Sequence, residues 1–429
     1  MKNKGIIVFC AALMLFTTAC NLTFQESEKP IEKPIVKEEL VMTTVSTGTL
    51  LSKLTQAVEQ FNGEEKNPIQ IVVKNYGTED YKNQLSLSMA IDEPPDLFFT
   101  WDEGFLQTYV ESGKVLAITD QVKETNTTVD IEPHVFESVS FQGDIYALPL
   151  VRTAAVVFYN RQLFEENNLE PPENYEQFLD TCSFFKDKGI TPLEISGSIQ
   201  WSYSQLFLQY LIKVGGEDLY NGLTNGTIPW TDKQVLQAAK EMKLLEENQF
   251  LNEDMLEIGM GSALKQIFDG NSAMYLEGSW CAAVSEKTTD TLGVFLFPVS
   301  EKTESNIGIS SIDQCYAISS ACSHPDIAWE FLSNLCSEEF QNGLQQYGYL
   351  PIRPQASDTP VTELEADMIA VDQKMKIRVS WLDRKLGAEM GTAINQTAQQ
   401  ILFSDETEDL LQSLQEKCSQ LSTNSASAS

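Results

Sequence analysis

The chain has 429 residues, 42% hydrophobic and 10% aromatic, which is enough for two to four domains with a sizeable core. Asp and Glu number 62 against 29 Lys and Arg, giving a formal net charge of −33. So acidic a chain would be repelled by phosphate backbones, which excludes nucleic-acid binding through a broad basic face. The only two histidines, His134 and His324, lie far apart in sequence and leave little scope for zinc chemistry or a Ser-His-Asp triad. We therefore expect neither a metal nor a cofactor.

Residues 1–19 have the layout of an export signal. Lys2 and Lys4 precede a mostly apolar stretch, residues 5–16, that is too short to span a bilayer. Small residues then lead to Cys20, and this arrangement resembles a bacterial lipoprotein signal in which that cysteine carries the lipid. The alternative is an ordinary secretory signal cleaved nearby. Export is expected in either case, and lipidation would anchor the chain to the outer face of the bacterial cell membrane.

Both ends of the mature chain are expected to lack a fold of their own. Residues 20–38 contain a Glu-Lys-Pro-Ile unit twice, and each proline blocks helix continuation, so we expect a tether. Residues 422–429 form a Ser-rich tail that is expected to be disordered. Six cysteines remain between these ends without a C-x-x-C pair, so disulfides and buried free thiols both stay open.

The first half of the body alternates strands and helices. Residues 40–47, 69–74 and 96–100 are rich in apolar and β-branched residues and are expected to be strands. A helix is expected over 49–61, with an apolar stripe of Leu51, Leu54, Val58 and Phe61. Strand–helix–strand order predicts parallel sheets covered by helices.

The same alternation restarts after residue 150 and predicts a second α/β lobe. A strand is expected over 155–159, followed by a helix that Asn174 and Gln177 open as a capping box and that ends at Gly189. A later helix is predicted from the pattern Val235, Ala239, Met242 and Leu245. Another is expected with Ser323 and Asp326 as its cap, Pro325 in its first turn, and a buried stripe of Ile327, Phe331, Leu332 and Leu335. Trp230 and Trp329 are expected to lie in the core.

Several segments, taken in order, resemble the extracellular solute-binding proteins of sugar-type ABC importers, with the architecture of maltose-binding protein. They are PPDLFFTWDEGFLQTYVESGKVLAITD at 94–120, the stretch 146–182 with its YALPL and VVFYN runs, GITPLEIS at 189–196, NSAMYLEGSW at 271–280, and residues 308–354.

The resemblance implies an α/β fold of the type II periplasmic-binding-protein class. In such a two-lobe clamp, each lobe is a mainly parallel sheet flanked by helices, and a multi-strand hinge joins the lobes. The expected first lobe comprises residues 39–148 plus 293–318, and the second comprises 149–292 plus 319–421. Crossings between lobes are expected near 148–150, 291–297 and 316–320, with a ligand closing the lobes around itself.

The resemblance also implies a non-enzymatic, monomeric lipoprotein. It would capture a sugar or oligosaccharide between its lobes and deliver it to the permease subunits of an ABC importer. Two alternatives remain open: a secreted glycoside hydrolase, which needs a pair of carboxylates, and a surface carbohydrate-binding lipoprotein without a transport role.

A sugar site needs flat aromatic platforms and polar side chains that pair with hydroxyl groups. Trp280 lies in the EGSW turn, where the family places an aromatic residue at the cleft, and Glu277 shares that turn. Trp101 and Asp102 follow an apolar strand, at the edge where doubly wound sheets bind ligands. The other expected ligand-binding residues are Trp201, Asp313, Trp381, the helix-opening pair Thr47 and Gly48, and Arg152, whose guanidinium could fork to two hydroxyls. Core packing, capping and surface ion pairs are the alternatives for these side chains.

Overall fold

The computed structural model describes residues 38–64, 67–125, 128, 131, 133–284, 291–299, 306–342, 344, 347–350, 352–353 and 362–428. Residues 38–429 form one compact unit. The expected signal, Cys20 and nearly all of the tether lie outside the described residues. The segment 422–428 is not an irregular tail, because helix α15 (Thr407–Ala428) continues through it. Residues 422–428 contain no Pro or Gly that would end the helix.

Three parallel strands begin the first lobe in the order β2-β1-β3. They are β1 (Glu38–Thr44), β2 (Ile69–Asn75) and β3 (Leu97–Thr100), close to the predicted ranges. Helices α1 (Gly48–Gly63) and α2 (Thr78–Ala90) connect them. The buried stripe of α1 is Leu50, Leu54, Val58 and Phe61, so Leu50 takes the place predicted for Leu51. A spacing of four residues keeps Leu50 on the face of Leu54.

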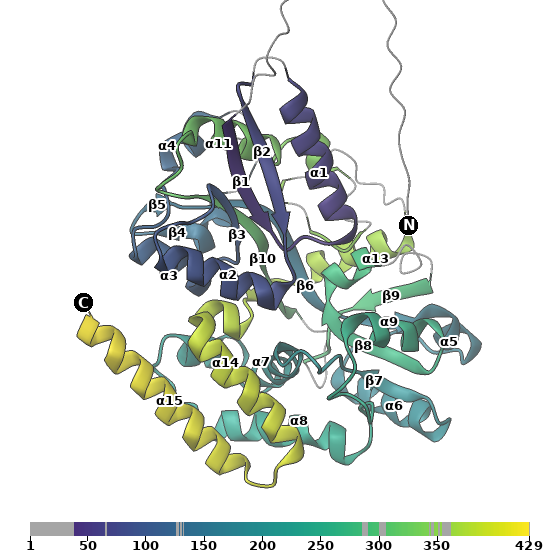
Figure 1. Ribbon diagram of the computed structural model, residues 1–429. Coiled ribbons are helices and arrows are strands. Elements are labelled where there is room, and N and C mark those ends of the chain that lie inside the picture. The colour runs from purple at the N-terminus through teal and green to yellow at the C-terminus, as the bar shows by residue number, and fades with distance from the viewer. Residues whose placement is uncertain are drawn as a thin grey trace, which may run out of the picture. The chain divides into compact units, whose positions relative to one another are not determined.

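Two long antiparallel strands, β6 (Leu148–Asn160) and β10 (Ile307–Ile318), link the first lobe to the second (Figure 1). The last four residues of β10 pair with β3, whereas its first three pair with β11 (Ile377–Val379) of the second lobe. The later part of β6 pairs with β8 (Ser272–Gly278) and β9 (Leu292–Phe295). Nine of the eleven described strands thus form one sheet that runs through both lobes, and the other two form a separate two-stranded sheet.

The expected crossing at 148–150 coincides with the start of β6, but the one at 291–297 is wrong. Residues 292–297 are β9 and the segment after it, and they lie in the apolar cores of the second lobe. The return is made by β10, which shifts its pairing register between Ile312 and Cys315. The second-lobe sheet is also mixed rather than mainly parallel. In it, β8 and β9 both pair antiparallel with β6, whereas β7 (Thr191–Glu194) pairs parallel with β8 and β11 pairs parallel with β10.

The first-lobe core gathers elements from both ends of the chain. It contains β1, α1 and β3 together with α11 (Pro325–Asn334) and α12 (Glu338–Gln341), which had been expected in the second lobe. Phe61 of α1 packs edge-on against Phe331 of α11 at 5.4 Å between ring centres. Pro325 is the first residue of α11, but its N-cap is His324 rather than Ser323, and no side chain caps it. Trp329 is 9% exposed, as a core residue should be.

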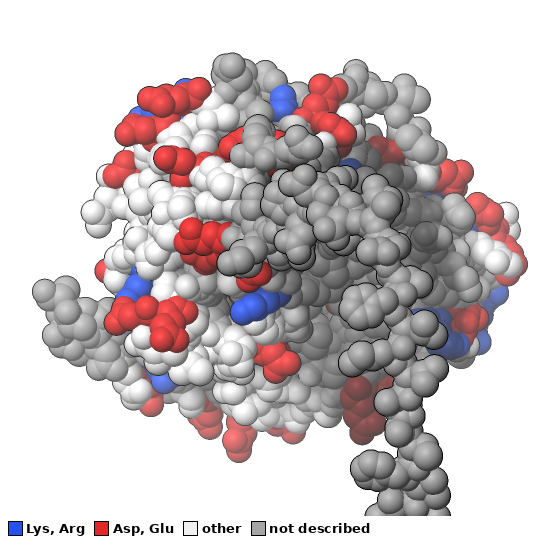
Figure 2. Space-filling view, turned by 45° about the horizontal axis from the view of Figure 1, so that its top comes forward, with Lys and Arg blue, Asp and Glu red and all other residues white. Residues whose placement is uncertain are grey.

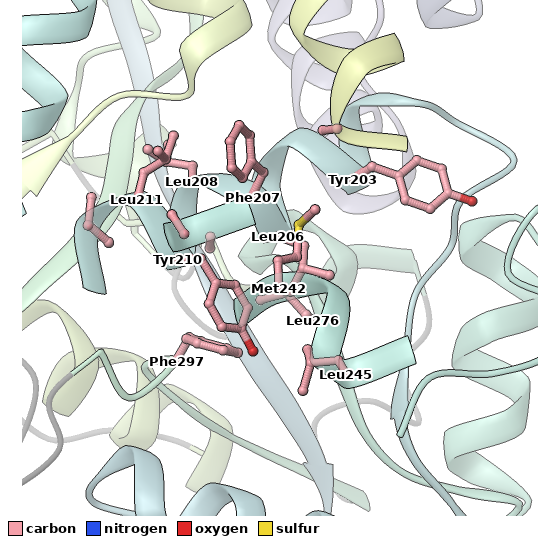
Figure 3. Close-up of a cluster of buried hydrophobic side chains, with 14 of the residues drawn as sticks. Tyr203, Leu206, Phe207, Leu208, Tyr210, Leu211, Met242, Leu245, Leu276 and Phe297 are labelled. Atoms are coloured by element: carbon pink, nitrogen blue, oxygen red, sulfur yellow. The ribbon is translucent and has the colours of Figure 1, made fainter. Parts of the chain in front are cut away.

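The second-lobe core is built around α7 (Trp201–Thr224) (Figure 3). Tyr210 and Phe297 meet at 5.8 Å, which ties the segment after β9 to α7. Asn174 caps α6 (Tyr175–Asp187) as predicted, because its side chain accepts from the Gln177 N–H. Trp230 is buried just before α8 (Lys233–Glu247), which Asp232 caps. The long α14 (Leu382–Phe403) packs on α7 and α8 and also contacts α3 (Glu103–Glu111) of the first lobe.

Eight further helices and strands complete the described structure. They are α4 (Thr119–Glu124), η2 (Pro133–Val139), β4 (Ser140–Phe141), β5 (Asp144–Ile145), α5 (Arg161–Glu166), α9 (Met260–Phe268), η3 (Ser279–Val284) and α13 (Glu363–Lys374).

Acidic side chains are spread over the visible surface and outnumber the basic ones (Figure 2). Within the described part of the chain, no helix has the length and apolar character needed to cross a membrane. Four of the described cysteines, Cys182, Cys281, Cys315 and Cys336, are buried free thiols, which is one of the two possibilities that the sequence left open.

Candidate functional site

A cavity of about 340 Å³ lies where the two lobes and β10 meet. This volume falls within the range of small-molecule sites. Its first-lobe lining is Val45, Thr47, Thr78, Glu79, Lys82, Phe99, Trp101 and Phe105. The rest of the lining is Ile199, Trp201, Met260, Trp280, Asp313, Gln314, Tyr349, Trp381, Asp383 and Arg384. Segments more than 300 residues apart in sequence thus converge on one space.

Aromatic rings form most of the cavity's flat surface. On the second-lobe side, Trp280 lies edge-on to Trp201 with ring centres 5.5 Å apart, and 5.6 Å from Trp381. On the first-lobe side, Trp101 contacts Phe99 at 4.8 Å and Phe105 at 5.1 Å. Each lobe therefore contributes an aromatic platform, as stacking on a ring-shaped ligand requires.

The direction of Trp280 is fixed by the glycine two residues before it. A methyl group at Gly278 would lie 2.1 Å from the indole ring, so the ring rests directly on that backbone. Ser279 is held as well, because its hydroxyl accepts from the Ala154 N–H at 3.1 Å. Only glycine lets the ring approach the chain this closely.

The main cation of the cavity is Arg384, which the sequence reasoning missed. Its guanidinium lies 4.4 Å from the Trp381 ring centre and 5.6 Å from that of Trp280. It also donates to Asp313 Oδ1 at 2.6 Å and to the Ile312 carbonyl at 3.3 Å. The local sequence does not identify it, because the carboxylate and the carbonyl that it bonds lie at least 70 residues away along the chain.

The opposite side of the cavity carries a second cation and a hydroxyl network. Lys82 lies 5.3 Å from the Trp101 ring centre and forms an ion pair with Glu79 at 2.9 Å. Ser46 donates to Gln314 Oε1 at 2.8 Å, which fastens the end of β1 to β10. Both lining cations are thus paired with lining carboxylates, and polar groups remain beside the rings for hydroxyl groups to bond.

The structure places six of the predicted site residues in this lining: Trp280, Trp101, Trp201, Asp313, Thr47 and Trp381. The prediction that they contact a ligand stays a prediction. Gly48 follows Thr47 and is needed for the backbone conformation, because its φ is +53° and a Cβ there would lie 2.5 Å from the Ala283 carbonyl oxygen. Arg152 points elsewhere, because it forms an ion pair with Asp372 of α13 at 3.2 Å.

Asp102 and Glu277 are fully buried and are not part of the cavity lining. Asp102 is the N-cap residue of α3, and burial, helped by the neighbouring Glu103, raises the pKa of its carboxyl to about 8. Burial likewise raises the pKa of Glu277 to about 7, although three hydrogen bonds favour its charged form. Each lies within three residues of a lining tryptophan in the sequence, but the sequence could not show that both side chains are buried away from the cavity.

A larger hollow of about 470 Å³ lies between α2 and α3 and shares Lys82, Trp101 and Phe105 with the cavity. Its lining comes almost wholly from the first lobe and is mainly apolar, with Leu85 and Met89 on α2. The cavity between the lobes fits a polar ligand better, because both lobes supply it with charged side chains and β10 adds the Gln314 amide.

Comparison with known proteins supports a binding role for this architecture. The uncharacterized ABC transporter extracellular-binding protein PH1039 of Pyrococcus horikoshii is 26% identical over 309 residues, covering 70% of this chain and 71% of that protein. The multiple sugar-binding protein of Streptococcus mutans is 22% identical over 343 residues, 77% of each chain. Among solved structures, a chitin oligosaccharide binding protein superposes with a TM-score of 0.81 at 21% identity, covering 89% of this chain and 98% of its own, which shows a shared fold.

The family model of bacterial extracellular solute-binding proteins matches residues 56–370. This match spans both lobes and includes most of the cavity lining. Because it covers well over half of the sequence, the chain belongs to the bacterial extracellular solute-binding protein family.

Proposed function

We propose that this protein captures a sugar or oligosaccharide in the cavity between its lobes and delivers it to the permease of an ABC importer. The observation that carries the proposal is the convergence of Trp101, Trp201, Trp280 and Trp381 on one cavity that also holds paired charges. Sugar rings offer apolar CH faces to aromatic platforms and hydroxyl edges to such polar groups. The names of the sugar-binding relatives, and the ABC transporter role given to PH1039, support the same ligand class and partner.

An exported protein fits the family. The lipid anchor at Cys20, on the outer face of the cell membrane, and a monomeric state belong to the proposal. The anchor rests on the sequence before Cys20, which places a short apolar stretch and small residues ahead of the cysteine.

We infer a binding protein rather than a glycoside hydrolase from the state of its carboxyl groups. A hydrolase needs a proton-donating carboxyl with a raised pKa beside the scissile bond. In the described part of the chain, the carboxyls whose pKa is raised are Asp102, Glu194, Glu277 and Asp367, and none of them lines the cavity. The carboxyls that line it are Glu79, Asp313 and Asp383. Two of them pair with cations, Glu79 with Lys82 at 2.9 Å and Asp313 with Arg384 at 2.6 Å.

The test is calorimetric titration of the purified protein with a panel of neutral mono- and oligosaccharides, followed by chromatography of the recovered sugar. We expect at least one sugar to bind and to be recovered uncleaved. It should also raise the melting temperature, since ligand at 100 times Kd stabilises the native state by about 2.7 kcal/mol. Trp101→Ala should weaken binding, whereas the control Trp329→Phe, on α11 and outside the cavity lining, should not. No binding across the panel, or cleavage of the bound sugar, would contradict the proposal.

A further inference from the structure

We infer that Glu277 is a positioning residue that sets the relative placement of Trp201 and Trp280 without touching the ligand. Its side chain is fully buried at the end of β8 and lies outside the cavity lining, while both tryptophans lie within that lining. The placement of the two tryptophans by Glu277 does not depend on a ligand, whereas the effect of Glu277 on sugar affinity rests on the proposed function.

The Glu277 carboxylate accepts three hydrogen bonds from three different chain positions. Oε2 accepts from the Ser196 hydroxyl and from the Tyr275 hydroxyl, each at 2.8 Å, and Oε1 accepts from the Gly278 N–H at 2.8 Å. A buried carboxylate with both oxygens bonded is fixed in place, and losing any of these donors leaves polar atoms unpaired. Glu277 therefore acts as a junction between β8 and the segment that follows β7.

One arm of the junction reaches Trp280. The Gly278 peptide that donates to Glu277 belongs to the residue on which the Trp280 ring rests. Tilting this peptide would move the surface under the indole ring. The carboxylate thus holds the backbone that gives Trp280 its direction.

The other arm reaches Trp201 through two serines. Ser196 follows β7, and residues 195–200 lead from there to Trp201, the first residue of α7. Ser202 donates to the Ser196 carbonyl at 3.1 Å, so the first turn of α7 is tied back to the residue that Glu277 holds. Because the Trp201 and Trp280 ring centres are only 5.5 Å apart, a small shift of either arm changes the shape of the platform.

The groups that face Glu277 make its protonation matter near neutral pH. They are the hydroxyls of Tyr275 and Ser196, the Gly278 N–H and, from η3, the thiol of Cys281. Burial raises the pKa of Glu277 to about 7 and the three donors oppose that rise, so both forms are populated at pH 7. A proton on Oε2 would add a donor there, and the hydrogen bonds among Glu277, Tyr275 and Ser196 would have to rearrange, since the two hydroxyls also lie 3.0 Å from each other. We therefore expect affinity to fall as pH drops from 8 to 6.

The matched control is Glu194, a second buried carboxyl in the same lobe. It is 1% exposed on β7, burial raises its pKa to about 7, and it accepts from Ser272 at the start of β8 instead of from Ser196. Glu277→Gln and Glu194→Gln each remove one buried charge while keeping the side-chain shape. If both variants lose the same stability but only Glu277→Gln changes the tryptophan spectra, the change reflects positioning and not the loss of a buried charge.

The experiment measures near-ultraviolet circular dichroism and tryptophan fluorescence without ligand, then Kd for a neutral sugar found by the panel. Glu277→Gln should change the tryptophan spectra, raise Kd by about tenfold and abolish the pH dependence between 6 and 8. Glu194→Gln should keep wild-type spectra, with Kd within about twofold. Ser196→Ala removes only one of the three hydrogen bonds to Glu277. It should change the spectra and Kd in the same direction as Glu277→Gln, and it replaces that variant in the test if Glu277→Gln does not fold.

Wild-type spectra and Kd in Glu277→Gln, or the same changes in Glu194→Gln, would overturn the inference. If Glu277→Gln does not fold, unchanged spectra and Kd in Ser196→Ala would overturn it too. If no sugar binds the wild-type protein, the proposed function fails, and the ligand-free spectra of the variants still decide whether Glu277 positions the pair.

Discussion

The buried ion pair between Arg384 and Asp313 should be a major contributor to the stability of the junction between the lobes. Each residue is only 8% exposed, and their nearest charged atoms are 2.6 Å apart. Arg384→Met would leave the Asp313 carboxylate buried without its cation, a defect that typically costs 3–5 kcal/mol. It would also remove the guanidinium from above Trp381, which adds roughly 1–2 kcal/mol for a desolvated cation–π contact.

Urea unfolding of four proteins tests this: the wild type, Arg384→Met, Asp313→Asn and the double variant. We expect about 4–7 kcal/mol for Arg384→Met, from the two effects above, and a double variant that loses less than the sum of the singles, because the second change removes the stranded charge. Additivity within about 0.5 kcal/mol, or an Arg384→Met cost below about 1 kcal/mol, would refute the reasoning. Unfolding is monitored by both fluorescence and circular dichroism, because coincident curves would show that the transition is two-state.

Three further predictions concern the site, its pH response and the anchor. Trp280→Ala should weaken sugar binding by about 1–3 kcal/mol in calorimetric titration, and full affinity with a collapsed melting temperature would assign Trp280 to the core instead. Because the pKa of Asp102 is about 8 in the folded state and about 3.9 in an unfolded chain, the folded protein binds the extra proton between these values, and stability falls as pH rises from about 4 to 8. Asp102→Asn should flatten that profile in melts at pH 5 and 8, and an unchanged slope would count against it. Cys20→Ser should release the protein from membranes on fractionation, and continued retention would argue against lipidation.

Much of the fold could be predicted because its cause is local. The stripe of α1 and the apolar run of β3 follow from side-chain periodicity within each segment, and Asn174 caps α6 as its type and position indicate. The lobe boundaries depended on packing between distant segments, and no local pattern encodes that. Residues 293–297 and α11 were therefore assigned to the wrong lobes, although α11 is a helix as expected.

The candidate site was likewise predictable only where its cause is local. The end of an apolar strand predicted the place of Trp101, and the resemblance to the family predicted that of Trp280; both line the cavity. Whether such a side chain faces the cavity or the core depends on its partners, as Arg152 shows by pairing with Asp372, 220 residues later. Arg384 was not predicted for the same reason, since its ion pair with Asp313 and its contact with Trp280 involve residues of other segments.

The register shift in β10 connects the cavity to the link between the lobes. Asp313 and Gln314 lie where β10 changes register between its second-lobe and first-lobe pairings, and both line the cavity. Asp313 is bonded to Arg384 of the second lobe, whereas Gln314 accepts from Ser46, which follows β1 of the first. These two neighbouring side chains therefore fasten β10 to opposite lobes from within the candidate binding site. A ligand that bonded either side chain would add to or compete with those hydrogen bonds, so binding there would bear on the relative placement of the lobes.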